Sequence, residues 1–517
     1  MAEKLIKMTT KSPTTADNNQ GFTVHQWLVL ATVMISSFLG RLDGSIVNLA
    51  LPKMISDFGI TVNEASWIAT AYIIANAVFV PVFGKLGDMI GRKKLYLAGI
   101  IGFTLTSMLA GLSWNFPAMI FFRVLQAITV SIDYPIALSI IAFNFPQPKQ
   151  RAMAMGMWSA IFAAAIIFGP LLGGPLIDTF GWRSVFYVNV PLGALGTFMA
   201  MRFITETVKE FKGLHHFDYE GSILLGICLG IMVLVLDQGQ TWGWASQASI
   251  LCYIITAITG YLFIWYERRQ KEPVVDLKFF KIPSFTAAIV TSFISFMGMI
   301  GGIFLIPIFV QTYLGYSVTK SGYVFIPMAF GMMISAQMGA RLSQKIPGKY
   351  LTAAGMFWAS FIMYLFTGLD VRWGFWHIAG LLFLMAAGLG AGLPTLTQAA
   401  TSTVPIQEVG VASSVLALAR NISAAFGTAI FATILTNSVY SQLINIEHYS
   451  QVNTIVPSTL QTVVSLMEVQ ANVSAYGVVF WWAAIITFVG GISALFVADY
   501  RQQAAAVHAR HTESMEM

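Results

Sequence analysis

Long apolar stretches recur along almost the whole chain and alternate with short polar segments. Each has the roughly 20 mostly apolar residues that an α-helix needs to cross the hydrocarbon core of a bilayer. We expect fourteen such spans, at 26–52, 66–86, 95–114, 117–144, 152–176, 184–203, 220–237, 248–266, 285–311, 322–341, 350–368, 374–402, 410–436 and 476–498. The pattern predicts an all-α integral membrane protein with 14 transmembrane helices.

The distribution of Lys and Arg predicts how these helices are oriented, because cytoplasmic loops carry an excess of both residues. Of the 29 basic residues, three lie in the interior of predicted spans and four fall in loops that face outward if the N-terminus is cytoplasmic. The other 22 then lie on the inner side or at its edge. We therefore expect cytoplasmic tails at 1–25 and 499–517. The longest loop, 437–475, is then an outer polar segment, either a solvated loop or a docking site for a partner.

The composition excludes several classes of protein. The chain is 56% hydrophobic and 10% charged, with a mean hydropathy of +0.72, whereas soluble proteins carry about 25% charged residues. These values argue against a water-soluble enzyme and against a disordered chain. The net charge of +6 comes from short scattered clusters, and nucleic-acid binding needs a continuous basic surface.

A glycine-rich and charged segment follows the second predicted span. It comprises Gly84, Lys85, Leu86, Gly87, Asp88, Met89, Ile90, Gly91, Arg92, Lys93, Lys94 and Leu95. A tight turn between two spans favours glycine, although a generic basic inner loop is the simpler interpretation. The full spacing resembles the loop signature of the major facilitator superfamily. A weaker copy at 339–349 keeps the glycines and cations without the acid, as expected for a transporter built from two related halves.

Other segments resemble the fourteen-helix drug:proton antiporters of the EmrB/QacA family. They are the run 42–52, the run 123–127 (where Ala127 replaces the usual glycine), the fifth-span residues Gly156, Gly169, Pro170, Gly173 and Gly174, and the run 218–224. The resemblance implies the major facilitator fold, with two six-helix bundles at 26–204 and 285–498 around a central cavity. A pair of helices is inserted between the bundles, within 205–284.

Charged residues inside the spans are the first candidates for function, since each costs about 2.5–3.5 kcal/mol at the bilayer centre. Arg41 and Asp43 lie on nearly opposite faces of one helix and do not pair with each other. Asp43 lies eight residues from the outer end of its span and Arg123 six residues from the outer end of its own. At about 1.5 Å per residue these depths match, so the two side chains are able to pair if their helices share a cavity.

Asp133 lies deeper, close to the midplane, and is followed by Tyr134 and Pro135. A carboxylate that is removed from water holds a proton more readily, and a nearby cation reverses the effect. A cycle that alternates these surroundings would drive proton exchange. The alternative is a structural acid that pairs with Arg41. We therefore predict that Asp43, Asp133, Arg123 and Arg41 couple proton entry to transport, and the sequence leaves open which acid carries the proton.

Two further groups of residues have predicted conformational roles. Gly84, Asp88, Gly91 and Arg92 would form a latch in which Asp88 binds the N-terminus of a helix in one state only. Small residues in the fifth span allow close helix packing, and Pro170 adds a kink; the family resemblance implies that this helix seals the transporter against leak. A fifth intramembrane charge, Arg420, is expected at the bundle interface as a structural residue, away from the main cavity.

Residues that contact the substrate are the least specified by the sequence. Met and aromatic side chains adapt to varied apolar ligands, and the candidates are Met157, Trp158, Phe304, Gln311 and Gln398. Lipophilic cations would pair with the two acids. The excess of intramembrane arginine would equally admit anionic amphiphiles such as fatty acids.

The predicted function is proton-coupled multidrug efflux by alternating access in a bacterial cytoplasmic (inner) membrane, without a cofactor. An exporter dedicated to one physiological amphiphile is the alternative. A P-loop for ATP is absent from the sequence, and its seven histidines fall outside the span interiors, which argues against a membrane-embedded metalloenzyme; a sensor would need a larger domain outside the membrane. The expected partners are small amphiphilic substrates, protons and lipid. The resemblance further implies a periplasmic adaptor and an outer-membrane channel if the cell has an outer membrane.

Overall fold

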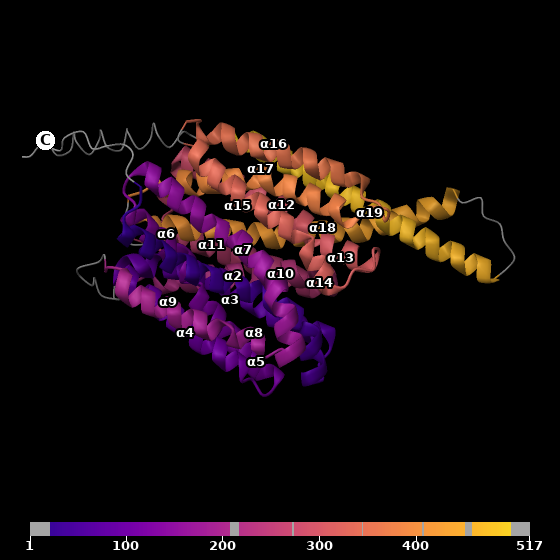
Figure 1. Ribbon diagram of the computed structural model, residues 1–517, viewed down its shortest axis with the longest axis horizontal. Helices are drawn as coiled ribbons and strands as arrows, with labels where there is room; N and C mark the ends of the chain where they lie inside the picture. Colours follow the sequence, from indigo (N-terminus) through magenta and orange to yellow (C-terminus); the bar gives the residue numbers. More distant parts are fainter. Residues whose placement is uncertain are drawn as a thin grey trace, which may run out of the picture.

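The computed structural model describes residues 21–206, 217–270, 273–343, 345–405, 408–449 and 457–497. Within these ranges the regular elements are all helices, and 13 of them or their near-continuous pairs are long and apolar enough to cross a membrane. One further helix, α7 (Pro148–Phe180), has 33 residues and occupies the position of the fifth predicted span. The expectation of an all-α chain with fourteen membrane-crossing segments is confirmed. Figure 1 shows how these helices are arranged.

The first six segments form one bundle, which we call the N half. In it α2 packs on α7 and α9, and α4 packs on α5 and α9. Its helices are α2 (Val24–Phe58), α3 (Val62–Ile90), α4 (Arg92–Gly111), α5 (Phe116–Val130), α6 (Asp133–Asn144), α7, α8 (Ser184–Tyr187) and α9 (Asn189–Phe203). We call the end of the molecule with the α3–α4 turn the Gly91 end, and the opposite end, with the α2–α3 turn, the Gly59 end.

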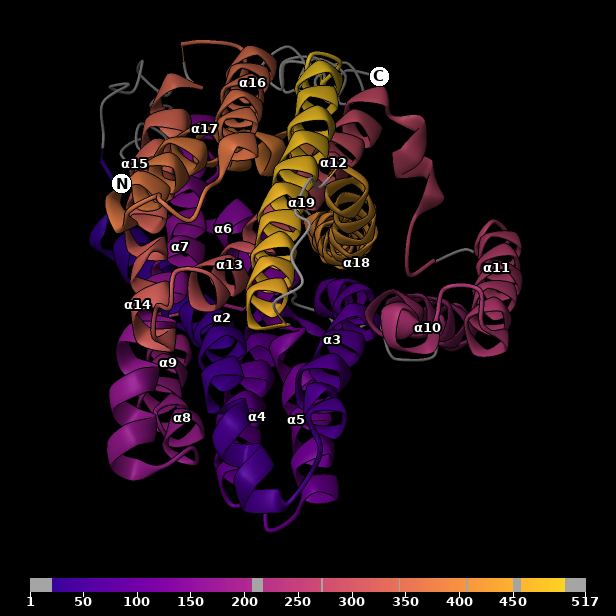
Figure 2. The same ribbon diagram turned by 90° about the vertical axis from the view of Figure 1, so that its right-hand side faces the viewer.

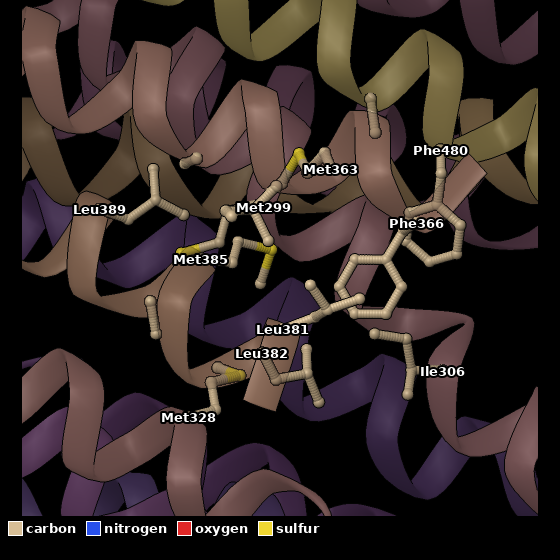
Figure 3. Packing of buried hydrophobic residues seen from close by; sticks show 14 of the residues in the cluster. Met299, Ile306, Met328, Met363, Phe366, Leu381, Leu382, Met385, Leu389 and Phe480 are labelled. Atoms are coloured by element: carbon tan, nitrogen blue, oxygen red, sulfur yellow. The ribbon is translucent and has the colours of Figure 1, made fainter. Parts of the chain in front are cut away.

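The last six segments form the C half, in which α15 and α16 pack on α17, and α12 packs on α18 and α19. Its elements are α12 (Pro283–Phe304), α13 (Ile306–Thr312), α14 (Val318–Tyr323), α15 (Phe325–Leu342), α16 (Gly348–Leu365), η3 (Phe366–Gly368), α17 (Phe375–Thr401), α18 (Val409–Tyr449) and α19 (Pro457–Ala494). Its core is rich in methionine, and Met299, Met363 and Met385 lie together there (Figure 3).

The two inserted helices, α10 (Tyr219–Trp242) and α11 (Gln247–Glu267), lie to one side of both halves (Figure 2). α10 contacts α3 of the N half and α18 of the C half. α11 exposes a row of large apolar side chains, including Leu251, Ile258 and Tyr261, as expected for a helix that faces lipid. A short helix, η2 (Leu277–Lys281), leads from the pair into α12.

The fourth segment is broken in its middle, between α5 and α6. Pro135 has no N–H to donate to the carbonyl of Ser131, four residues earlier, so the helical bond is missing there. The Ser131 hydroxyl donates to the carbonyl of Ala127 at 2.6 Å. The break makes Asp133 the first residue of α6, which places a carboxylate at irregular backbone in the interior of the bundle.

The expectation that residues 437–475 form a loop was wrong, because most of this segment is helical. α18 continues as a helix to Tyr449 and α19 begins at Pro457, and the two project beyond the Gly59 end as a pair (Figure 1). Between Thr436 and Pro457 there is neither glycine nor proline to end the first helix. Residues 450–456 lie outside the described residues.

Candidate functional site

A cavity lies between the two halves. Its main lobe has a volume of about 270 Å³. The lining is mostly apolar, and its polar members come from four helices. The lining side chains are Arg41, Tyr134, Trp158, Ser159, Ala165, Phe296, Met299, Ile300, Ile303, Met328, Met332, Leu393, Ala417, Arg420, Asn421 and Ala424. Met299 and Met328 belong to the core of the C half as well (Figure 3).

A second and more polar lobe adjoins the first and has a volume of about 200 Å³. The two lobes share Arg41, Tyr134, Ala417 and Asn421. Arg41 is an exposed residue. Because it lines both lobes, its exposed surface faces the cavity. The polar lobe is otherwise lined by residues of the N half, which are Ser37, Gly40, Gly44, Tyr72, Asn76, Val80, Val130 and Asp133.

Asp133 is the carboxylate of the polar lobe. Its Oδ2 accepts a hydrogen bond of 2.7 Å from the Ser37 hydroxyl, whose oxygen accepts one of 2.8 Å from Trp158 Nε1. Its Oδ1 is buried and has no hydrogen-bond partner among the described residues. The chain from Trp158 through Ser37 therefore links the main lobe to a carboxylate with one unsatisfied oxygen.

Asp43 lies in a different environment, although it is on the same helix as Arg41. It is fully buried, and its Oδ2 accepts from Arg123 Nη1 at 2.5 Å. Its Oδ1 accepts from Gln126 at 2.9 Å and from Asn189 at 3.1 Å. The pairing that the depths of Asp43 and Arg123 permit is thus observed, within a network that satisfies both carboxylate oxygens. Neither residue lines the lobes of the cavity.

The predicted latch residues lie where α3 crosses α18 near the Gly91 end. A methyl group added to Gly84 would come within 2.6 Å of Ser414 and 2.9 Å of the carbonyl of Gly410. Asp88 lies against the first turn of α18, since a methyl group on Gly410 would come within 2.7 Å of its Oδ2. Asp88 Oδ1 accepts from Arg92 Nη2 at 3.3 Å. The carboxylate thus faces the positive end of a helix dipole.

Gly91 ends α3 and precedes α4. Its φ of +119° is a conformation that favours glycine. A side chain would also meet the carboxyl group of Glu206, within 2.7 Å, and that group accepts from the backbone N–H of Lys94 at 3.2 Å. Both observations explain the glycine that ends this motif.

The small residues of α7 bring it close to both halves. Gly169 packs against the hydroxyl of Ser45, and Gly173 packs against Ile46 and Leu49, all on α2. Near the Gly91 end, a methyl group on Gly156 would come within 2.7 Å of Ala340 on α15. Pro170 lies within the helix, and Gly174 is less tightly packed, with its nearest neighbour 3.6 Å away. Close packing is therefore the first role of these glycines.

Of the five predicted substrate contacts, only Trp158 lines the main lobe. Met157 packs on the apolar core of the N half, Phe304 is 45% exposed, Gln311 donates to Ser321 at 2.9 Å, and Gln398 is buried. The structure does not bring these four residues to the cavity. No spacing pattern had singled them out, which explains why their orientation was not predictable.

The expectation that Arg420 lies away from the cavity was wrong, because Arg420 lines the main lobe with Asn421. Its Nη1 donates to the Tyr134 hydroxyl at 2.6 Å and its Nη2 to Thr397 Oγ1 at 3.0 Å. The sequence did contain a signal for this face. Ala417, Arg420, Asn421 and Ala424 follow the three- and four-residue spacing of one helical face, and small or polar residues there indicate an interior surface.

The family model of the Major Facilitator Superfamily matches residues 33–428. The chain belongs to the major facilitator superfamily. It is 31% identical over 417 residues to the Multidrug resistance protein Stp of Mycobacterium tuberculosis (strain CDC 1551 / Oshkosh), covering 79% of this chain and 76% of Stp. It is 29% identical over 426 residues to the Multidrug export protein EmrB of Escherichia coli (strain K12), covering 79% of this chain and 80% of EmrB.

Other members of the superfamily match a larger share of the chain. The Riboflavin transporter RibZ of Clostridioides difficile (strain 630) is 27% identical over 476 residues, covering 91% of this chain and 97% of RibZ. The crystal structure of the human organic anion transporter MFSD10 (TETRAN) superposes with a TM-score of 0.61 at 13% identity, covering 91% of this chain and 99% of that one; this likeness concerns the fold. The chain is thus a multi-pass membrane transporter of small molecules, and not an enzyme.

Proposed function

We propose that the protein is a proton-coupled efflux antiporter of amphiphilic compounds in a bacterial cytoplasmic membrane. The similarity to Stp and EmrB, which are named for multidrug resistance and export, supports drug efflux. The excess of basic residues in the loops of the Gly91 end supports a cytoplasmic position for that end and for both termini. The cavity between the halves would then bind a substrate and open alternately to each side.

The single observation that carries the proton-coupling proposal is the position of Asp133. Its carboxylate lines the polar lobe beside Arg41, and one of its oxygens has no hydrogen-bond partner among the described residues. Such an oxygen is available to bind a proton that arrives through the lobe. Asp43 has both oxygens occupied and no access to the lobe in this conformation. Asp133 would therefore load the proton here, while Asp43 and Arg123 would exchange partners in another conformation.

The latch and the glycine-rich helix would control which side of the cavity is open. Asp88 contacts the first turn of α18 only while the halves are closed at the Gly91 end, and Gly84, Gly91 and Arg92 would hold it there. The tight α7 contacts at Gly156, Gly169 and Gly173, with Pro170 and Gly174 in the same helix, would seal the path against leak. In this proposal the two bundles, 26–204 and 285–498, are the parts that move relative to each other, and the inserted pair of helices lies between them in the sequence.

In a cell with an outer membrane, the protein would work with a periplasmic adaptor and an outer-membrane channel. The projecting ends of α18 and α19 support it, because they extend beyond the Gly59 end, which is the outer end in this orientation. They carry the polar segment that the sequence places outside.

The test is substrate-dependent proton movement in proteoliposomes, with a pH-sensitive dye inside. The native protein is compared with Asp133→Asn, and with Asp57→Asn as a control for the loss of one carboxylate, because Asp57 is a half-exposed acid outside the cavity. We expect Asp133→Asn to keep substrate counterflow, which needs no proton gradient, and to lose acceleration by the gradient. Intact coupling in Asp133→Asn would assign the proton to Asp43, and no proton movement with any amphiphile in the native protein would overturn antiport.

One relative favours a second candidate function. RibZ is named for riboflavin transport and aligns with a larger share of this chain than Stp or EmrB. A dedicated proton-coupled exporter of one physiological amphiphile would show saturable transport of that compound with weak competition by unrelated drugs. Mutual competition among unrelated drugs in the same proteoliposomes would support the multidrug exporter instead.

A further inference from the structure

The main lobe of the cavity combines an apolar wall with positive charge. Two arginines, Arg41 and Arg420, line it, and none of its lining residues in the described part of the chain is acidic. Among the described residues, Asp133 is the one carboxylate of the cavity, and it lies in the polar lobe, which Arg41, Tyr72 and Tyr134 also line. Arg420 comes from the opposite half of the molecule, and Asp133 is not among its contacts. No carboxylate of the described residues therefore balances the charge at the Arg420 side of the lobe.

The hydrogen bonds of Arg420 lead to the same conclusion. A guanidinium carries five N–H donors, and the structure records acceptors for two of them, the hydroxyls of Tyr134 and Thr397. The Nε atom is buried and has no hydrogen-bond partner among the described residues. In the described part of the chain, no carboxylate lies within 4.0 Å of the group, so both of its partners are neutral. The ring of Phe296, 5.0 Å from the guanidinium carbon, offers a weaker attraction.

A buried cation with neutral partners is unfavourable unless an anion compensates it. An arginine fork binds carboxylate, sulfate and sulfonate groups through two parallel hydrogen bonds. Next to Arg420 the lobe offers Met299, Met328 and Met332, whose flexible side chains accept apolar groups of many shapes. The site thus has a cationic head position and an adaptable apolar wall in one space.

We propose that the main lobe selects amphiphilic organic anions, with the acidic head group on Arg420 and the apolar part against the methionines of α12 and α15. This inference rests on the proposed function, since it names the substrate class of the exporter. It also explains a pairing across the cavity. The substrate anion compensates Arg420 on the C-half side while the proton occupies Asp133 on the N-half side, so the two ligands bind at separate charges.

The experiment uses two probes with the same ten-carbon chain and opposite permanent charges, decyl sulfate and decyltrimethylammonium. Binding to the purified protein is measured by calorimetry below the micellar concentration of each probe, and transport is measured in proteoliposomes with an imposed pH gradient. Arg420→Gln, Arg420→Lys and the control Arg372→Gln are compared with the native protein. Arg372 is an exposed arginine of a loop, with 89% of its side chain accessible, so its substitution removes one positive charge outside the cavity.

We expect the native protein and Arg372→Gln to bind decyl sulfate at least tenfold more tightly than decyltrimethylammonium. Arg420→Gln should lose at least tenfold in affinity for decyl sulfate without losing affinity for the cation, and Arg420→Lys should retain part of the selectivity because it keeps the charge without the fork. Equal affinity of the native protein for both probes, preference for the cation, or equal loss of both in Arg420→Gln would overturn the proposal.

Binding selectivity and gradient-driven transport test the substrate class and the proton coupling separately. Anion-selective binding without movement driven by the pH gradient would leave the substrate class standing and would contradict proton-coupled transport. Gradient-driven transport of the cation in preference to the anion would support the antiporter and overturn the anion site. The comparison of native affinities needs no variant, so poor folding of an Arg420 variant does not remove the test.

Discussion

Arg420 Nη1 of α18 donates a hydrogen bond of 2.6 Å to the hydroxyl of Tyr134 on α6, and this bond joins the two halves of the transporter across its cavity. Tyr134 follows Asp133 directly in the chain, so the residue that contacts the opposite half is next to the carboxylate of the polar lobe. A movement that separates the halves has to break this bond or carry α6 with it. The contact therefore connects the conformation of the two halves with the surroundings of Asp133.

Tyr134→Phe should destabilise the described conformation. A hydrogen bond to a charged group contributes about 1.5–3 kcal/mol, so its loss should shift the population toward other conformations by about tenfold or more. The measurement is the distance distribution between spin labels at Lys94→Cys on α4 and Tyr350→Cys on α16, two exposed positions near the Gly91 end. The native Cys228 and Cys252 are replaced by serine.

We expect a longer-distance population to grow in Tyr134→Phe. Tyr364→Phe is the matched control, since the side chain of Tyr364 is 55% exposed on α16 and lies outside the cavity lining. Identical distance distributions for the native protein and Tyr134→Phe would show that the Tyr134–Arg420 bond does not stabilise the described conformation.

Asp43→Asn should destabilise the fold strongly. The Asp43–Arg123 pair is buried, and removal of one partner from a buried pair costs about 3–5 kcal/mol because the other charge stays behind. Asp57→Asn is the control, because Asp57 also pairs with an arginine, Arg183 at 3.4 Å, yet both side chains are more than two-fifths exposed. Exposed pairs contribute about 0–1 kcal/mol.

The measurement is the temperature at which half of the detergent-purified protein stays monodisperse on a sizing column. A clear fall for Asp43→Asn with little change for Asp57→Asn is expected. Equal falls for both variants would contradict the prediction that the buried Asp43 network stabilises the fold more than the exposed Asp57–Arg183 pair.

Gly169→Ala should weaken the contact between α2 and α7. The added methyl group would meet the hydroxyl and Cβ of Ser45, which is anchored by bonds to the carbonyls of Leu42 at 2.9 Å and Ala165 at 3.2 Å. Overpacking of this kind costs about 1–3 kcal/mol. Gly174→Ala on the same helix is the control, with its nearest neighbour at 3.6 Å, an ordinary contact.

The readout for these two glycines is leak as well as stability, since tight packing of α7 is the proposed seal. Proton leak through proteoliposomes without substrate should rise for Gly169→Ala and stay at the native level for Gly174→Ala. A leak that rises equally in both variants would indicate a general loss of packing.

Much of the fold follows from the sequence, because a bilayer allows few solutions for a chain with fourteen long apolar stretches. The match in depth between Asp43 and Arg123 was predictable for the same reason: helices that cross one bilayer place residues at depths set by simple counting. Pro135 indicated that the helix would open locally, because proline lacks the N–H that would bond to the carbonyl of Ser131. The structure was needed to show that the break makes Asp133 the first residue of α6.

Side-chain direction was the part that counting did not supply. Arg420 was recognised as a charge near the midplane, but the face of α18 that meets the cavity depends on how that helix packs against α3 and α6. The helical ends of α18 and α19 were missed because polarity marks the end of the hydrocarbon layer and does not end a helix. The methionine, phenylalanine and glutamine candidates failed to converge because apolar residues in a membrane protein face lipid, core or cavity with the same composition.

Gly410→Ala tests the latch without removing a charge. A methyl group there would come within 2.7 Å of both Asp88 Oδ2 and the carbonyl of Gly84, and the backbone carbonyl has little freedom to move. The helices α3 and α18 should therefore separate at the Gly91 end. We expect maleimide to label Ser414→Cys faster in Gly410→Ala than in the parent, because Ser414 is fully buried beside Gly84.

Gly380→Ala on α17 is the matched control for this substitution, since nothing lies within 4 Å of the added methyl group. Asp88→Asn should act in the same direction as Gly410→Ala and more weakly, because a carboxylate at a helix N-terminus contributes about 0.3–1 kcal/mol, rising to about 2 when partly buried. Substrate binding should survive in both variants while transport falls, since the latch lies outside the cavity. Unchanged labelling of Ser414→Cys in both would mean that the α3–α18 contact is held by other interactions, such as the hydrogen bond from Asn421 to Asn76, and that Asp88 does not control the opening.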